Sequence, residues 1–353
     1  MPWPLFFGWF LANPLDDAQL ILESNASGLD ALELQKAAIN GMLQHADSQN
    51  GHHGSRVMTS DEKDAHQAWL MGRRSGYGLR IRIVSGRGLL IDSILAESPA
   101  AQAGLQERDL IVAFADQPLT GLPPERVLAL LEHPHEGNVF VDVLRNGELR
   151  RFQLSRGHFW IQSATQSDVQ IQIHFWGEGV AQTVKQFLNR AEAKLILDLR
   201  DNEGGLIDEV MTTLGYFTGE NVTVAQRYKD AQPSLMVTST EKAYTGEIVI
   251  LINKGTAGLS ELFVQALREN CGAQIVGETS AGVAGAFDLF SLTDDLYIYT
   301  ASAEWRSGMG QSWKGVGITP DVMVRTSMNN PSMGGRVVDL QLETGRRLLM
   351  EAN

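Results

Sequence analysis

From residue 169 onward, apolar positions alternate between short aliphatic runs and stretches at helical spacing. A helical pattern over 179–191 is followed by buried runs at 194–199, 247–252 and 274–276. Such runs lack the polar alternation of a half-exposed strand, and helices separate them, so they predict a mainly parallel sheet with right-handed crossovers. An amphipathic pattern over 337–350 predicts a closing helix.

The segment 78–154 has a different pattern, with short alternating strands and one helix over 124–132. The helix begins at Pro124, which suits the first turn because the missing N–H would be unpaired there anyway. The pair Asn146-Gly147 joins two alternating runs and predicts a tight hairpin. This segment is therefore predicted to be a separate, mostly β domain.

The N-terminal region combines a helical pattern with an apolar run. Residues 16–43 carry apolar side chains at helical spacing, whereas 44–64 are polar and aperiodic, which predicts a loop. Residues 2–12 are strongly apolar but too short to span a bilayer, which takes roughly 20 residues. This run fits a trimmed export signal, an interfacial anchor that gives membrane association, or a hydrophobic arm that packs on a partner chain.

Composition limits the classes of function. The chain has 353 residues, 43% of them hydrophobic and 20% charged, as expected for a soluble multidomain protein. Its net charge of −13 opposes binding to nucleic acid. The pair His52-His53 has no second ligand pair at metal spacing, so no metal or cofactor is expected. A single cysteine, Cys271, excludes an internal disulfide, and Gly272 after it indicates a helix end.

Six segments, in order, resemble the carboxyl-terminal processing peptidases, also called tail-specific serine proteases. The match at 195–206 is to D-L-R-x-N-x-G-G-L, and the match at 317–322 is to G-I-T-P-D-V. Each segment alone is a weak signal, but six of them with comparable spacing are specific. The other four segments are 37–43, 76–79, 98–112 and 275–279.

The resemblance implies a multidomain protein that mixes α/β and β architecture. The implied core is an α/β domain of the crotonase/ClpP-like protease type, with a mainly parallel sheet. The expected divisions are a helical N-terminal region at 1–67, a PDZ-like domain at 68–155, the core at 156–330 and a C-terminal helix at 331–353.

The family's catalytic positions carry residues that cannot perform the family's chemistry. The family pattern G-[ST]-A-S-x-S-E places the nucleophile at Gly258, and the pattern F-G-K-G-x-x-Q places the base at Val283 and its orienting amide at Phe287. A serine nucleophile needs a hydroxyl, a base and oxyanion donors. The resemblance therefore implies a family member whose nucleophile, base and orienting groups are absent. Ser260 is a fallback nucleophile, although its usual role is hydrogen bonding at a helix start.

Backbone groups survive such replacements. The resemblance places the oxyanion donors at Gly204 and Gly205, together with the N–H of Leu259. A carbonyl or carboxylate could dock there, or the two glycines could simply form a tight strand-to-helix turn.

The PDZ-like segment predicts a peptide site. Gly76, Tyr77, Gly78 and Leu79 resemble the loop whose backbone N–H groups hold a terminal carboxylate, with 79–84 as the edge strand that a peptide extends. Alternatively, the two glycines only begin a strand. We expect Val127 and Leu130 to line the pocket for the terminal side chain and to favour aliphatic residues.

Three hypotheses remain open from the sequence. The preferred one is a pseudoprotease that binds protein C-termini or partner proteins through its PDZ-like domain. The second is an active serine endopeptidase with a displaced nucleophile. The third is a structural subunit that forms a homo-oligomer or a hetero-complex through its terminal helices. The family resemblance favours a periplasmic or otherwise extracytoplasmic location.

Overall fold

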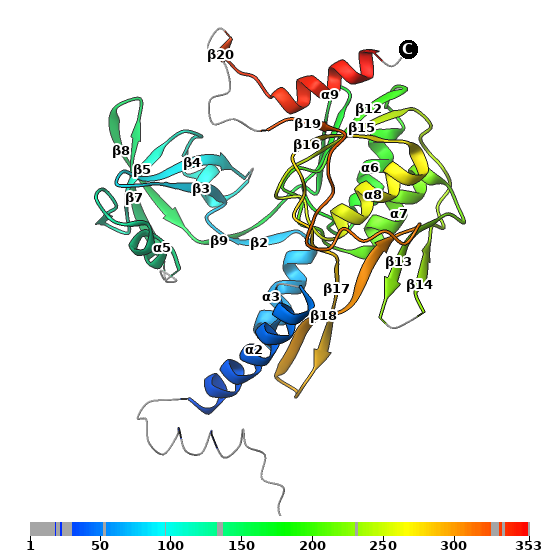
Figure 1. Cartoon of the computed structure of the whole chain (residues 1–353). Coiled ribbons are helices and arrows are strands. Elements are labelled where there is room, and N and C mark those ends of the chain that lie inside the picture. The colour runs from blue at the N-terminus through cyan, green and yellow to red at the C-terminus, as the bar shows by residue number, and fades with distance from the viewer. Residues whose placement is uncertain are drawn as a thin grey trace, which may run out of the picture.

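The computed structural model describes residues 30–51, 54–95, 97–132, 137–229, 232–325, 332–333 and 336–351, together with Ala18 and Leu22. Figure 1 shows N-terminal helices, a β-rich domain, an α/β core and a C-terminal helix. The apolar run at 2–12 and the His52-His53 pair lie outside the described residues. No helix within the described ranges is long and apolar enough to cross a membrane.

The loop predicted over 44–64 is mostly regular structure, so that prediction is wrong. Helix α2 (Ala31–Asn50) continues past residue 43, and β1 (Arg56–Thr59) and α3 (Ser60–Leu70) follow it. The polar side chains that made this segment look aperiodic form local hydrogen bonds. Thr59 and Glu62 form a capping box at the start of α3.

The β-rich domain is an antiparallel sheet in the order β3-β4-β5-β7-β8, with β6 paired to β5. The predicted hairpin is confirmed, since Asn146 and Gly147 have φ values of 53° and 85° between β7 and β8. Strand β3 lies at the edge of the sheet, as expected. The elements are β3 (Leu79–Val84), β4 (Gly88–Ile94), α4 (Pro99–Gln102), β5 (Leu110–Phe114), β6 (Gln117–Pro118), α5 (Pro124–Glu132), β7 (Asn138–Arg145) and β8 (Glu148–Ser155).

The core sheet has the order β10-β11-β12-β15-β16-β19. The prediction of a mainly parallel sheet is confirmed, because every neighbouring pair from β11 to β19 is parallel and only β10 is antiparallel. The strands are β10 (Ala164–Ser167), β11 (Gln170–Ile173), β12 (Lys194–Asp198), β15 (Glu247–Ile252), β16 (Gln274–Gly277) and β19 (Val322–Met323).

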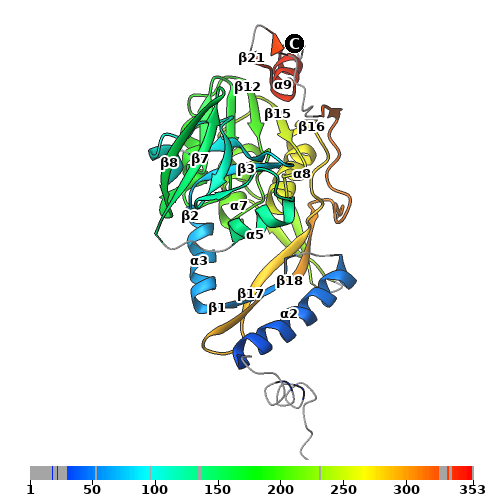
Figure 2. The ribbon, with the colours of Figure 1, turned by 90° about the vertical axis from the view of Figure 1, so that its left-hand side faces the viewer.

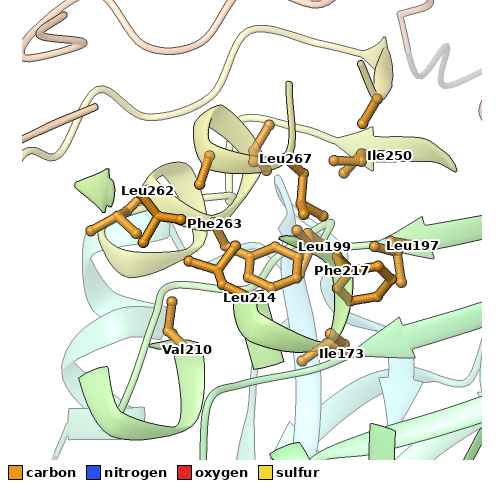
Figure 3. Packing of buried hydrophobic residues seen from close by; sticks show 14 of the residues in the cluster. Ile173, Leu197, Leu199, Val210, Leu214, Phe217, Ile250, Leu262, Phe263 and Leu267 are labelled. Atoms are coloured by element: carbon orange, nitrogen blue, oxygen red, sulfur yellow. The ribbon is translucent and has the colours of Figure 1, made fainter. Parts of the chain in front are cut away.

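Alternate residues of these strands pack on opposite faces of the core sheet. On one face, Leu197 and Ile250 pack against α6 (Val180–Leu188), α7 (Ile207–Thr218) and α8 (Leu259–Cys271), as Figure 3 shows for part of this cluster. On the other face, Ile196 and Val249 contact α9 (Leu340–Glu351), the predicted closing helix. The sheet is therefore buried on both sides, which is why its strands read as continuous apolar runs.

A second sheet, which the sequence did not predict, joins the N-terminal region to the core. Its order is β1-β18-β13-β14, with β17 also paired to β18. Figures 1 and 2 show the β17–β18 hairpin extending from the core beside α2. Its remaining strands are β13 (Thr223–Tyr228), β14 (Ser234–Val237), β17 (Gly285–Ser291) and β18 (Leu296–Ser307).

Two connections hold the PDZ-like domain to the core. Strand β2 (Arg73–Gly76) pairs with β9 (Gly157–Trp160), so the chain enters and leaves the domain as an antiparallel pair. Arg80 on the edge strand β3 also forms an ion pair with Asp201 of the core, at 3.4 Å.

The short strands β20 (Ser332–Met333) and β21 (Arg336–Val337) pair before α9.

Candidate functional site

A cleft of about 910 Å³ lies between the PDZ-like domain and the core. One wall is built from the loop at residues 76–79 and from β3 and β4. The other wall includes His174, Asp201 and Glu203 of the core. Burial lowers the pKa of His174, whose Nε2 lies 3.2 Å from the Thr165 hydroxyl. The predicted peptide loop lines this cleft, whereas Gly258, Val283 and Phe287 do not line it.

Residues 76–79 form a tightly supported loop at this cleft. The carbonyl of Tyr77 accepts a hydrogen bond from the Ala100 N–H, and the carbonyl of Gly78 accepts one from the Leu95 N–H, both at 2.9 Å. None of the described residues accepts a bond from the Tyr77 or Gly78 N–H. The loop can therefore offer two fixed backbone donors to an anionic group such as a carboxylate.

The residues expected to line the terminal pocket do not do so. Val127 is only 1% exposed and lies inside the core of the PDZ-like domain. Leu130 packs on the same core, and neither residue lines the cleft. The apolar face of α5 packs into the core of the PDZ-like domain, so these side chains do not reach a peptide. Apolar contact in the cleft comes instead from Tyr77, Leu79, Ile81 and Phe114.

Gly258 lies at the turn between β15 and α8, at the N-cap of the helix, with φ 59° and ψ −122°. This conformation is strained for any residue with a side chain, and strain of this kind gathers at functional turns. A Cβ placed here would meet only the Glu203 carbonyl oxygen, at 3.2 Å. A side chain at this position would therefore be strained by the backbone and would press on the Glu203 carbonyl.

A buried carboxylate connects this turn to the segment at 280–283. Glu261 is fully buried, and its oxygens accept hydrogen bonds from the Ser280 hydroxyl and from the N–H groups of Gly282, Val283 and Gly258, at 2.5–3.0 Å. Burial raises the pKa of Glu261, although all four donors favour the charged form. Glu261 is not among the site residues predicted from the sequence. A glutamate three residues after a helix N-cap is the signal that could have found it.

The positions that the family resemblance gives to the base and the orienting amide carry apolar side chains. Val283 is half-buried, and its carbonyl accepts a hydrogen bond from the Trp313 indole N–H at 3.3 Å. The Phe287 ring stacks on Tyr299, with centroids 5.0 Å apart and an angle of 20°. Arg56 of β1 lies over the same Tyr299 ring at 5.0 Å. An aromatic contact within the second sheet, between β17 and β18, thus occupies the place that the family resemblance gives to an amide.

The three predicted oxyanion positions differ in what they can donate. Gly204 donates its N–H to the Asn202 side chain at 3.0 Å, so this donor is committed. Gly205 has a packing reason to be glycine, because a Cβ there would lie 2.3 Å from the Trp176 carbonyl oxygen. The Leu259 N–H finds no acceptor among the residues that the structure describes, and it lies beside Gly204.

Ser260, the fallback nucleophile, points away from the cleft. Its side chain is fully buried, and its hydroxyl accepts a hydrogen bond from the Trp176 indole N–H at 2.9 Å. A nucleophile needs a base within hydrogen-bond reach, and an indole N–H can only donate. The observed role of Ser260 is to satisfy a buried indole in the core.

The fold and the site define a PDZ-bearing α/β protein of the serine-peptidase type. Residues 169–324 match the family model described as peptidase family S41, and residues 90–145 match that of a PDZ domain. The chain therefore contains an S41 peptidase-family domain and a PDZ domain, and it is similar to the carboxyl-terminal processing peptidases.

Its relatives are distant. Over 301 residues the chain is 25% identical to the carboxy-terminal processing protease CtpA of Bacillus subtilis, covering 82% of this chain and 64% of that one. It is 24% identical over 306 residues to a probable CtpA-like serine protease of Staphylococcus haemolyticus, covering 84% and 61%. The chain therefore spans about three fifths of the length of the curated relatives it matches.

Solved structures share the fold. A photosystem II D1 C-terminal processing protease aligns with a TM-score of 0.56 and 20% identity, over 95% of this chain and 90% of that one. A chain from Bacteroides fragilis NCTC 9343, described as an S41 protease, aligns with a TM-score of 0.67 and 12% identity, over the full length of both.

Proposed function

We propose that this protein binds the free C-termini of peptides or proteins in the cleft between its PDZ domain and its core, and does not cut them. The observation that carries the proposal is the loop at 76–79, which lines the cleft and whose Tyr77 and Gly78 N–H groups have no acceptor among the described residues. The turn between β15 and α8 has glycine at position 258. The loop has donors for an anion, whereas the turn has no side chain to attack a carbonyl.

Several features support the lack of cleavage. In subtilisin, losing the serine nucleophile lowers kcat by a factor on the order of 10⁶. Here the base and orienting positions are apolar as well, and the alternative Ser260 hydroxyl is buried against Trp176. The curated relatives are named as proteases, so the proposal separates this chain from them by the residues at 258, 283 and 287.

We predict that the purified chain binds a free-acid peptide but leaves it intact. Because the Tyr77 and Gly78 N–H groups would hold the carboxylate, amidating the peptide C-terminus should weaken binding at least tenfold, about 1.4 kcal/mol. Fluorescence anisotropy measures the affinity, and mass spectrometry of an unfolded substrate detects cleavage. Equal affinities for the two peptides would contradict the binding site. Cleavage that disappears in Ser260→Ala would establish the displaced nucleophile.

A second prediction concerns restoring the nucleophile. Gly258→Ser together with Val283→Lys should give at most weak covalent labelling by a serine-directed fluorophosphonate. The Cβ of the serine would lie 3.2 Å from the Glu203 carbonyl oxygen, and the backbone at 258 is strained by about 1–3 kcal/mol. Phe287 cannot orient a lysine. Gly258→Ala is the control that carries the same strain without a hydroxyl. Labelling equal to that of an active family member would contradict this expectation.

A further inference from the structure

The edge strand β3 presents one cation to the cleft. Its side chains alternate, with Leu79 and Ile81 packed against the core of the PDZ domain and Arg80 and Arg82 exposed. Of the two arginines, only Arg80 lines the cleft. None of the described strands pairs with the outer edge of β3. A peptide that extends the sheet at this edge would therefore lie beside Arg80.

Arg80 is held more loosely than the other arginine of the strand. Arg82 donates to Asp92 on β4 at 2.9 Å, the usual length of a hydrogen bond between two charged groups. Among the described residues, Arg80 reaches only Asp201 of the core, with its Nη1 3.4 Å from Oδ2. The side chains of Arg80 and Asp201 are 56% and 52% exposed, so water screens their attraction. Arg80 can therefore change partners at little cost.

Asp201 keeps other partners when Arg80 leaves it. Its Oδ1 accepts a hydrogen bond from the Asn253 side-chain nitrogen at 2.9 Å, and its N–H donates to the Asn253 side-chain oxygen at 2.9 Å. These two bonds support the left-handed conformation of Asp201, which has a φ of 59°. Because the carboxylate is also half-exposed, the exchange leaves no buried charge without a partner.

A bound tail would bring its penultimate side chain to Arg80. Under the proposed function the N–H groups of Tyr77 and Gly78 hold the terminal carboxylate at the start of β3, so the tail runs antiparallel to the strand. The last residue then lies opposite Leu79 and the penultimate residue opposite Arg80. Residues directly opposite each other in an antiparallel pair project to the same face, with Cβ atoms about 4.5–5.5 Å apart. At such positions opposite charges attract and like charges repel.

Building on the proposed function, we propose that Arg80 selects tails with a carboxylate side chain, aspartate or glutamate, at the penultimate position. The acidic side chain takes the place of Asp201 beside the Arg80 guanidinium. A penultimate lysine would stand opposite Arg80 and be disfavoured. Because the Arg80–Asp201 ion pair joins the PDZ domain to the core, an acidic tail also releases that connection when it binds.

The test uses the full chain and labelled free-acid peptides that carry glutamate, glutamine or lysine at the penultimate position or at the position before it. Fluorescence anisotropy measures the affinities. At the penultimate position, glutamate should bind about two- to fivefold more tightly than glutamine, and lysine more weakly than glutamine. At the preceding position the preference for glutamate should be absent, because that side chain projects to the other face of the sheet.

Two variants should move this preference in opposite directions. Arg80→Gln should bring the affinities for the penultimate glutamate and glutamine peptides to within about 1.5-fold of each other. Asp201→Asn should increase the preference, because it removes the competing charge, while asparagine keeps an oxygen for Asn253 and tolerates a positive φ. Arg150→Gln is the control for the loss of one positive charge. Arg150 lies on β8 outside the cleft, paired with Glu148 at 2.9 Å, so this control should keep the preference.

The outcomes separate this inference from the proposed function. If free acids bind better than amides but penultimate glutamate is not favoured, or its advantage survives in Arg80→Gln, the inference is wrong and the proposed function stands. A preference that does not rise in Asp201→Asn contradicts the exchange of partners, and this variant decides even if Arg80→Gln does not fold. If no free acid binds better than its amidated form, the proposed function is wrong, and the inference that rests on it is wrong too.

Discussion

Replacing Gly78 with alanine is expected to abolish peptide binding and to lower the free energy of unfolding of the PDZ domain by about 2–5 kcal/mol. Gly78 has a φ of +77°, and a Cβ there would lie 2.1 Å from the Cβ of Ser98, which is fully buried. Left-handed strain accounts for about 1–2 kcal/mol and the overlap for about 1–3 kcal/mol. The loop must move to relieve the overlap, and the carboxylate donors would move with it.

Gly121→Ala is the matched control for this prediction. Gly121 has a nearly equal φ of +81°, but a Cβ there would meet nothing within 4 Å. This control should lose only the strain contribution of about 1–2 kcal/mol and should keep its affinity for a free-acid peptide. Thermal melting measures the loss of stability in both variants, and a peptide titration measures their affinities. Equal losses would show that overlap with Ser98 plays no part.

Glu261→Gln is expected to destabilise the core by about 2–4 kcal/mol and to lower its melting temperature by about 5–15 °C. All four groups around the Glu261 carboxylate are donors, three of them backbone N–H groups. A glutamine amide must turn its own N–H₂ toward some of them. At least one buried N–H then loses its acceptor, and the remaining bonds lose the strength that a charged acceptor gives.

The control for this change lies on the same helix. Glu269 accepts a hydrogen bond from the neutral Gln265 side chain at 3.0 Å and is only partly buried. Glu269→Gln should change the free energy of unfolding by less than about 1 kcal/mol. If both variants had the same melting temperature, the link that Glu261 makes between the turn at 258 and the segment at 280–283 would not contribute to stability.

The core could be predicted from the sequence because its strands are buried on both faces. Continuous apolar runs at β12, β15 and β16 gave nearly the observed bounds, and the Asn146-Gly147 pair fixed the hairpin of the PDZ domain. In each case the signal lies within a few residues of the element that it predicts. The loop predicted over 44–64 failed because β1 gains its stability from β18, far along the chain.

The site was only partly predictable for the same reason. Motif spacing found the loop at Tyr77 and Gly78, which lines the cleft, and the turn at Gly258, which does not, since backbone turns are encoded locally. The pocket assignment failed at Val127, because helical periodicity marks an apolar face without saying whether a ligand or the core covers it. The Phe287–Tyr299 stack was not predicted, because it joins two strands of a sheet that no local sequence pattern indicates.

That stack has an evolutionary consequence. The Phe287 ring now contributes to the folded state through Tyr299, and such ring pairs add about 0.5–1.5 kcal/mol beyond their buried area. Under the proposed function, a descendant with glutamine at 287 would lose this contribution at once and gain no turnover until positions 258 and 283 had also changed. Selection on stability alone would therefore oppose the change from phenylalanine to glutamine at 287.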